Sequence, residues 1–226
     1  MSTATVTARS VVRDRLLLDN VDWRTYTRFL YLFAERPGYR LTYDRGRLEI
    51  MSPLPLQERC ANFLGWLAIT MTEELGSPIL QGGSVTLRRR HRQRGLEPDR
   101  CYWIANEAAV RGKDRLDLRV DPPPDLAIEV DVTSSSLNRM SIYAALGVPE
   151  VWRLDNQTLT FHALDANGKK YTAISHSLSF PLVTPADLMG FVAMCAGQDE
   201  NSVIRQFRAW VQQQQPAAGG TTPPAP

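Results

Sequence analysis

Residues 124–136 read PDLAIEVDVTSSS and contain the clearest β-strand of the sequence. The centre of this stretch, residues 126–132, is rich in the β-branched and apolar side chains that favour strands. Prolines precede the strand and three serines follow it, so residues typical of turns mark both of its ends. A predicted helix follows over residues 137–146, and Ser136 can cap its start while Gly147 ends it.

The segments around this strand alternate between helix and strand patterns. Those before it predict a helix near 22–35, a hairpin over 39–51, a long helix over 56–75, and strands near 79–87 and 98–104. Those after it predict strands near 150–154, 158–163 and 170–174, then helices near 185–196 and 201–212. This order predicts an α/β fold, a single domain in which helices flank a mixed central β-sheet.

The two ends of the chain differ from its centre in composition. The last segment, QQQQPAAGGTTPPAP at 212–226, has no charge and no large apolar side chain, so we expect a disordered tail. Residues 1–14 show no pattern that would pair them with another segment, and we expect them to be flexible. The folded domain is therefore predicted to span residues 15–211.

The composition excludes several classes of protein. Of the 226 residues 43% are hydrophobic, enough for one core, and three widely spaced cysteines give neither a disulfide framework nor a zinc motif. The longest apolar stretch, residues 60–72, is shorter than the roughly 18 residues that a membrane helix needs. No signal peptide opens the chain, so we expect a cytoplasmic protein without a membrane partner. A net charge of +2 does not by itself indicate nucleic-acid binding.

Acidic residues near predicted strands are the best candidates for chemistry. The sequence has no glycine-rich nucleotide motif, no hydrolase elbow and no histidine pair at metal-ligand spacing. Glu129 lies within an otherwise apolar strand, where a carboxylate is costly to bury without a cation or a hydrogen-bond donor. Either its strand is half exposed, or Glu129 binds a hard cation such as Mg²⁺. The acidic candidates are Glu97, Asp99, Asp125, Glu129 and Asp131.

Strand geometry narrows the possible partners of Glu129. Residues rise about 3.3 Å apiece along a strand, so Asp125 and Glu129 would lie about 13 Å apart and could not share one ion. Adjacent strands lie only about 4.8 Å apart, which makes Asp99, at the start of another strand, the better partner. Glu97, Asp125 and Asp131 remain alternatives to these ligands.

Four segments resemble the Uma-two family of restriction endonucleases, within the PD-(D/E)XK nuclease superfamily. They read LTYDRGRLEIMSP (41–53), EPDRCYWI (97–104), PDLAIEVDVTSSS (124–136) and YAALGVPEVWRLD (143–155), in that order. The resemblance implies a restriction-endonuclease-like fold. It also implies an endonuclease that hydrolyses phosphodiester bonds in DNA with Mg²⁺ or Mn²⁺, and we expect the chain to form a homodimer.

The resemblance implies roles for individual residues. Asp99 corresponds to the PD aspartate and Glu129 to the acidic residue of the (D/E)XK triplet, so both are expected metal ligands. Glu58, on the preceding helix, is expected to complete the site. The triplet reads Glu129-Val130-Asp131, with aspartate in place of lysine. The family's lysine can lie on the next helix instead, and Arg139 occupies that position.

Arginine at this position changes the chemistry. Lysine can lose its proton when its pKa is lowered, whereas arginine stays protonated, with a pKa above about 12. Arg139 is therefore expected to stabilise negative charge, and the attacking water has to be activated by the metal. The alternative is that Arg139 is a solvent-facing helix residue.

A run of arginines precedes the strand that carries Asp99. Residues 88–94 contain five arginines, and Arg88, Arg89 and Arg90 are predicted to bind the phosphate backbone of DNA. The alternative is a solvated hairpin loop. Two other functions stay open, a nuclease-fold protein that binds nucleic acid without cutting it and a module that binds a protein partner through its last helices.

Overall fold

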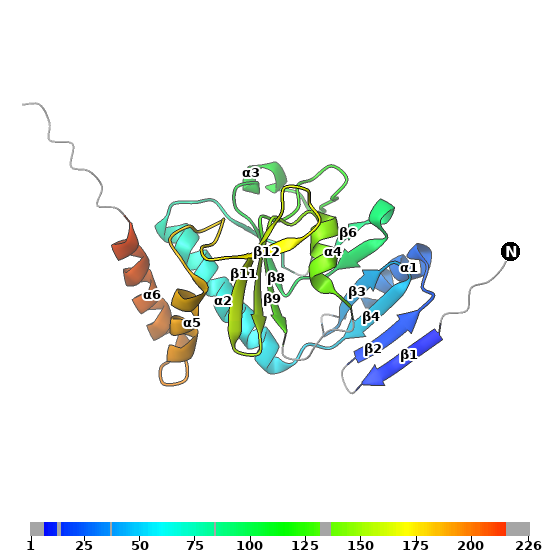
Figure 1. The fold of residues 1–226 in the computed structure, drawn as a ribbon, viewed down its shortest axis with the longest axis horizontal. Helices are drawn as coiled ribbons and strands as arrows, with labels where there is room; N and C mark the ends of the chain where they lie inside the picture. Colours follow the sequence, from blue (N-terminus) through cyan, green and yellow to red (C-terminus); the bar gives the residue numbers. More distant parts are fainter. Residues whose placement is uncertain (1–6, 13–14, 37, 84, 132–136, 216–226) are drawn as a thin grey trace, which may run out of the picture.

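The computed structural model describes residues 7–12, 15–36, 38–83, 85–131 and 137–215. Two six-stranded β-sheets lie next to each other, and helices cover their faces (Figure 1). Within the described residues, no helix is long and apolar enough to cross a membrane.

The sheet that contains the Glu129 strand is mixed, as the sequence predicts. Only β9 and β10 run parallel, because α4 (Arg139–Leu146) connects them, and the remaining neighbours are antiparallel. Its strand order is β12 (Tyr171–Ile174), β11 (Thr158–Leu164), β10 (Glu150–Asp155), β9 (Leu126–Asp131), β8 (Arg100–Trp103) and β5 (Leu80–Gln81).

Two hydrophobic layers cover the faces of this sheet. Side chains alternate along β9, so Leu126, Ile128 and Val130 pack against α2 (Pro55–Glu74), α5 (Pro185–Met194) and α6 (Glu200–Gln214). Ala127 packs on the opposite face, against α4. Glu129 follows the same alternation and therefore faces α4.

The second sheet is antiparallel and was not predicted as a separate sheet. Its strand order is β1 (Thr7–Val12), β2 (Arg15–Asp19), β4 (Arg47–Met51), β3 (Arg40–Asp44), β7 (Arg94–Leu96) and β6 (Leu87–Arg89). Asp22 caps α1 (Trp23–Phe33), which packs on one face of this sheet, where Tyr26 and Tyr43 stack with ring centroids 4.6 Å apart.

The strand β3 has two different faces. Leu41 and Tyr43 belong to the hydrophobic cluster under α1. Arg40, Thr42 and Asp44 alternate with them and are also buried. Because successive side chains of a strand point to opposite faces, these three polar residues face away from α1, toward the mixed sheet.

Several boundaries differ from the sequence prediction. The predicted strand near 79–87 is two strands, β5 and β6, which belong to different sheets. The helix α4 begins at Arg139 with Asn138 as its cap, and Ser136 lies outside the described residues. The helix α6 continues to Gln214, three residues into the predicted tail, and Gln212 Nε2 donates to Glu74 Oε2 at 2.7 Å. Residues 216–226 are outside the described part of the chain.

Leucine-to-alanine changes test the layer between α2 and the mixed sheet. Leu64 is completely buried there, so Leu64→Ala should lower the free energy of unfolding by about 2–5 kcal/mol, since it removes apolar contacts and leaves a cavity. Leu32 is exposed on α1, and Leu32→Ala should change it by no more than about 0.5 kcal/mol. Urea denaturation measures both, and equal losses would contradict this assignment of the core.

Candidate active site

Asp99 and Glu129 lie next to each other on adjacent strands. Asp99 directly precedes β8, and the antiparallel register pairs Arg100 with Ile128, which places Asp99 opposite Glu129. Both carboxyl groups are buried, each residue being 2% exposed. The half-exposed strand considered for Glu129 is therefore excluded.

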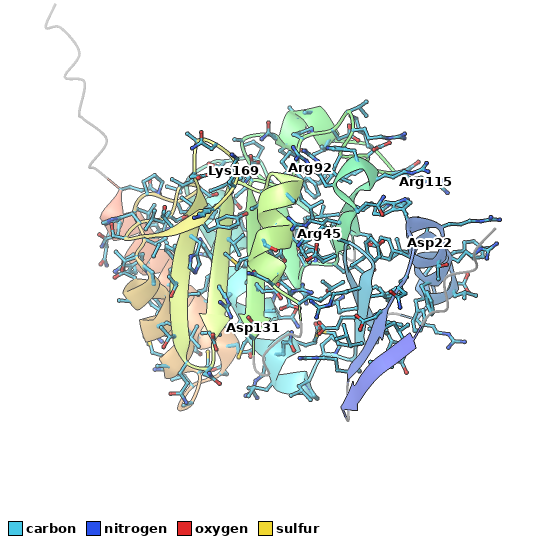
Figure 2. The ribbon with its side chains drawn as sticks, turned by 45° about the vertical axis from the view of Figure 1, so that its right-hand side comes forward. Asp22, Arg45, Arg92, Arg115, Asp131 and Lys169 are labelled. Atoms are coloured by element: carbon cyan, nitrogen blue, oxygen red, sulfur yellow. The ribbon has the colours of Figure 1, made fainter. Side chains whose placement is uncertain are left out.

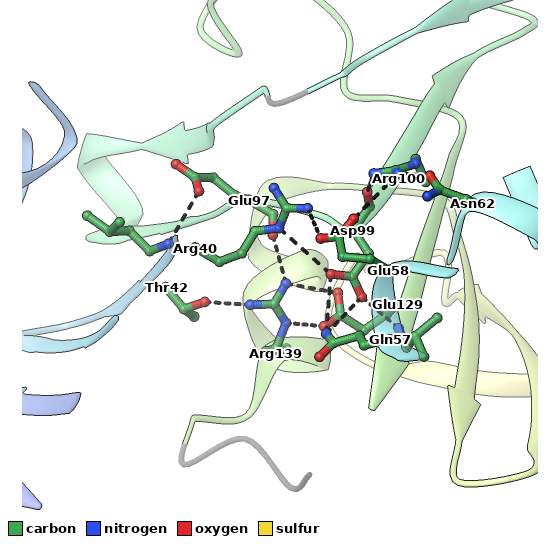
Figure 3. A network of polar contacts seen from close by, with 12 residues as sticks. Arg40, Thr42, Gln57, Glu58, Asn62, Glu97, Asp99, Arg100, Glu129 and Arg139 are labelled. Atoms are coloured by element: carbon green, nitrogen blue, oxygen red, sulfur yellow. Dashed lines mark hydrogen bonds and ion pairs between the residues drawn. The ribbon is translucent and has the colours of Figure 1, made fainter. Parts of the chain in front are cut away.

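The carboxylate of Glu129 is held from the first two turns of α4 (Figure 3). Its Oε2 atom accepts from Arg139 Nη2 at 2.9 Å and from the Tyr143 hydroxyl at 2.6 Å, and Arg139 Nε pairs with Oε1. Arg139 and Tyr143 are four residues apart, so they share one face of the helix. Burial raises the pKa of Glu129 to about 7, although Arg139 opposes this rise.

Arg139 is a fixed, buried cation. It is 6% exposed, so it is not a solvent-facing helix residue. Its remaining donors reach Thr42 Oγ1 on β3 and, at 2.9 Å, the backbone oxygen of Glu97. Burial alone would lower the pKa of Arg139, but Glu129 and Tyr143 raise it well above its usual value. Arg139 can donate hydrogen bonds here but cannot accept a proton.

Asp99 is held by neutral donors and faces a more distant cation. It accepts from the backbone N–H of Val130 at 2.8 Å and from Gln57 Nε2 at 3.3 Å, and Arg40 Nε lies 3.9 Å away. Burial raises the pKa of Asp99, while Arg139 and the Val130 hydrogen bond lower it. The residue of α2 that contacts Asp99 is thus Gln57, a neutral amide, and not the acid Glu58.

Glu58 lies one residue further along α2 and is turned toward two arginines. Its Oε1 accepts from Arg40 Nη2 at 2.6 Å, and Arg100 Nη2 lies 3.5 Å from Oε2. The structure thus brings Glu58 to the edge of the site, whereas Gln57 takes the position beside Asp99. Sequence reasoning missed Gln57, Arg40 and Tyr143, and the only signal for Arg40 was the alternation of Arg40, Thr42 and Asp44 along β3.

The alternative acidic ligands are bound elsewhere. Glu97 accepts from the backbone N–H of Leu41 at 3.3 Å and from Thr86 Oγ1 at 3.0 Å. Asp125 lies at the opposite end of β9 and accepts from the backbone N–H groups of Ile104 and Asn106. Asp131 pairs with Arg153 at 2.9 Å. None of these contacts involves Asp99 or Glu129.

The arginine run forms the tip of the β6–β7 hairpin, which includes the short 3₁₀ helix η1 (Arg90–Arg92). Arg88, Arg90 and Arg92 are exposed there. Arg89 is half-buried beside Gly147, and burial lowers its pKa. The strand β7 separates η1 from Asp99, and Figure 2 shows Arg92 near the top of the view and Asp131, at the end of β9, near the bottom.

Two carboxylates of the site are of the kind that can hold a divalent cation. Mg²⁺ binds hard oxygen ligands and is often held by one or two carboxylates together with water and substrate phosphate. Asp99 and Glu129 supply such oxygens, but no group of three His, Cys, Asp or Glu residues in the described ranges could hold a metal. Arg40, Arg100 and Arg139 balance the charges of Glu58, Asp99 and Glu129, which weakens the attraction for a cation.

The mixed sheet with an acidic pair on adjacent strands and a cation from the following helix defines a restriction-endonuclease-like α/β protein. The family model Uma2, described as "Putative restriction endonuclease", matches residues 23–193, and the chain belongs to this family. The crystal structure described as "a putative nuclease belonging to DUF820 from Anabaena variabilis" is similar, with 15% sequence identity and a TM-score of 0.45. That similarity covers 71% of this chain and 97% of the other. No curated protein sequence gives a significant match.

A double-mutant cycle tests the buried ion pair. Arg139→Met should lower the free energy of unfolding by about 3–5 kcal/mol, because Glu129 loses its cation inside the protein. The double variant with Glu129→Gln should lose less than the sum of the two single changes. Urea denaturation gives the three values. Arg119→Met serves as the control, because the Arg119–Asp117 pair is exposed and its loss should have no measurable effect.

Proposed function

We propose that this chain is a divalent-metal-dependent endonuclease that hydrolyses phosphodiester bonds in DNA. The observation that carries the proposal is the pair of buried carboxylates, Asp99 and Glu129, on adjacent strands with Arg139 fixed on Glu129. Membership in the Uma2 family supports the same chemistry. A homodimer and a cytoplasmic location stay predictions from the sequence.

Asp99 and Glu129 would hold Mg²⁺ or Mn²⁺ through their carboxylate oxygens. A cation at this position supplies Lewis-acid stabilisation of the phosphate and activates the attacking water. Neither carboxylate is free to move, since Val130 and Gln57 hold Asp99 while Arg139 and Tyr143 hold Glu129. The protein therefore presents both acids in a fixed arrangement before substrate arrives.

Arg139 stabilises the negative charge that develops on the phosphate. Its guanidinium is planar and is already oriented by Thr42, Glu129 and the Glu97 backbone. A guanidinium fixed in this way needs little reorganisation during the reaction. Because Arg139 keeps its proton, it contributes as a donor and the proton of the attacking water leaves by another route.

A second function, nucleic-acid binding without cleavage, is favoured by the charge balance of the site. Three arginines accompany three carboxylates, and the group on α2 next to Asp99 is the neutral amide of Gln57. Both features lower the affinity for a divalent cation. A chain that keeps the fold but binds no cation would still attract DNA through its exposed arginines.

Plasmid cleavage separates the two functions. Wild-type protein with Mn²⁺ should nick supercoiled DNA, and a chelator should stop it. Asp99→Asn should abolish the activity, because the amide no longer supplies a negative ligand oxygen. Arg139→Gln should cut about 10²–10³-fold more slowly, a typical cost of removing one preorganised donor. Circular dichroism of each variant verifies that it is folded.

Two outcomes would contradict the cleavage function or the role of Arg139. If the wild type fails to cut with any divalent metal but Arg139→Lys cuts, the binding-only function is correct and the scaffold lacks only a lysine. If Arg139→Gln cuts as fast as the wild type, Arg139 has no part in stabilising the phosphate.

The exposed arginines of the β6–β7 hairpin should bind the DNA backbone. Replacing Arg88, Arg90 and Arg92 together with Gln should weaken duplex binding and reduce the slope of log K against log salt, by about 0.9 for each lost phosphate contact. Arg205→Gln, an exposed change on α6, is the matched control and should leave the slope unchanged. Fluorescence anisotropy at several salt concentrations measures it, and an unaltered slope in the triple variant would show that the hairpin is only a solvated surface.

A further inference from the structure

The helix α2 carries an exposed tryptophan two turns beyond Glu58. Trp66 is 43% exposed, although α2 buries most of its other large side chains. Among the described residues of α2, β8, β9 and α4, it is the only exposed aromatic side chain. Trp66 therefore presents part of its ring to solvent on the surface of α2. The buried aromatics of these elements are Phe63, Tyr102, Trp103 and Tyr143.

Trp66 shares one row of the helix with residues of the site. Glu58, Asn62 and Trp66 are spaced by four residues, so their side chains follow one another along the same face of α2. Figure 3 shows Asn62 next to Arg100 and close to Glu58. Trp66 thus lies one turn beyond the polar network.

A continuous chain of contacts leads from the buried acid to this row. Arg40 Nε lies 3.9 Å from Asp99, and Arg40 Nη2 lies 2.6 Å from Glu58. Glu58 lies 3.5 Å from Arg100, and Arg100 donates to Asn62. The Arg40 side chain is 8% exposed, whereas those of Glu58 and Arg100 are 33% and 25% exposed. The polar network therefore leads from the buried acid to the surface beside α2 and Arg100.

The outer strand of the sheet does not extend alongside Arg100. The outer strand β5 has only two residues, which pair with Trp103 and Tyr102. Arg100 lies beyond the end of that pairing, at the start of β8. A strand of nucleic acid can approach Arg100 here without displacing any described strand.

We propose that Trp66, Asn62 and Arg100 form the surface along which a DNA strand with an unpaired segment reaches Asp99. This inference rests on the proposed function. The indole of Trp66 stacks on an unpaired base, and the positive charge of Arg100 attracts a phosphate of the same strand. A base inside a duplex is already stacked on both sides, so a ring that binds by stacking selects single-stranded or opened DNA.

Binding in the presence of a chelator tests the surface without requiring cleavage. A single-stranded oligodeoxythymidylate should quench tryptophan emission of the wild type and bind about 5- to 150-fold more tightly than it binds Trp66→Leu, the range expected for one stacked base. Trp66→Phe should keep most of the affinity but lose the quenching. Trp210→Leu, a change on α6, should leave the affinity unchanged. Affinity for a blunt duplex should change less in Trp66→Leu than affinity for the single strand.

The outcomes separate this surface from the nuclease function. If Trp66→Leu binds the oligonucleotide as well as the wild type while plasmid is still cut, the surface is wrong and the function stands. If Trp66→Leu instead alters only the sedimentation coefficient, the surface joins two copies of the chain and the inference is overturned. If the wild type neither binds nor cuts any DNA, the proposed function fails and this inference fails with it.

Discussion

The carboxylate of Glu129 is costly to bury without a cation or hydrogen-bond donors beside it, and the groups that meet this need link the two sheets. Arg139 supplies the charge from the first turn of α4, and its other donors require Thr42 on β3 and the backbone of Glu97. The same face of β3 supplies Arg40 to Asp99 and Asp44 to Arg94. The contact between the sheets is therefore polar around Glu129, and beside it an apolar cluster joins Leu87 and Leu96 of the second sheet to α4 and the mixed sheet.

Local pattern predicted the elements of the site, but it did not predict how they are arranged. The apolar run of β9 and the partnership of Glu129 with Asp99 on another strand were predicted, because strand residues and turn residues alternate clearly along residues 97–131, whereas the register between β8 and β9 was not. Whether Gln57 or Glu58 lies beside Asp99 depends on the rotation of α2 about its own axis. The packing of α2 against the sheet sets this rotation. Arg40 was missed because the docking of its hairpin on the mixed sheet is a tertiary contact without a sequence signature.

The choice of arginine at position 139 has two opposite consequences for the site. Its planar guanidinium makes several directed hydrogen bonds at once, so it orients Glu129 and joins α4 to β3 more firmly than a single ammonium could. Its permanent charge also competes with a divalent cation for the same carboxylate. The site is thus rigid, and its positive and negative charges balance. Arg139 would attract the negative charge of a DNA phosphate whether or not the phosphodiester bond is cut.

The position of the arginine hairpin limits the length of DNA that the proposed function could place between it and the acidic pair. Asp99 lies seven residues after Arg92, so the two are at most about 23 Å apart along an extended chain. Phosphates follow each other about 3.4 Å apart along one strand of a DNA duplex, so this span covers at most about seven nucleotides. A duplex held by Arg88, Arg90 and Arg92 could therefore extend along β7 to the acidic pair, and an opened strand beyond that point would meet Arg100 and Trp66. The hairpin would position the duplex, and the row on α2 would receive the strand that leaves it.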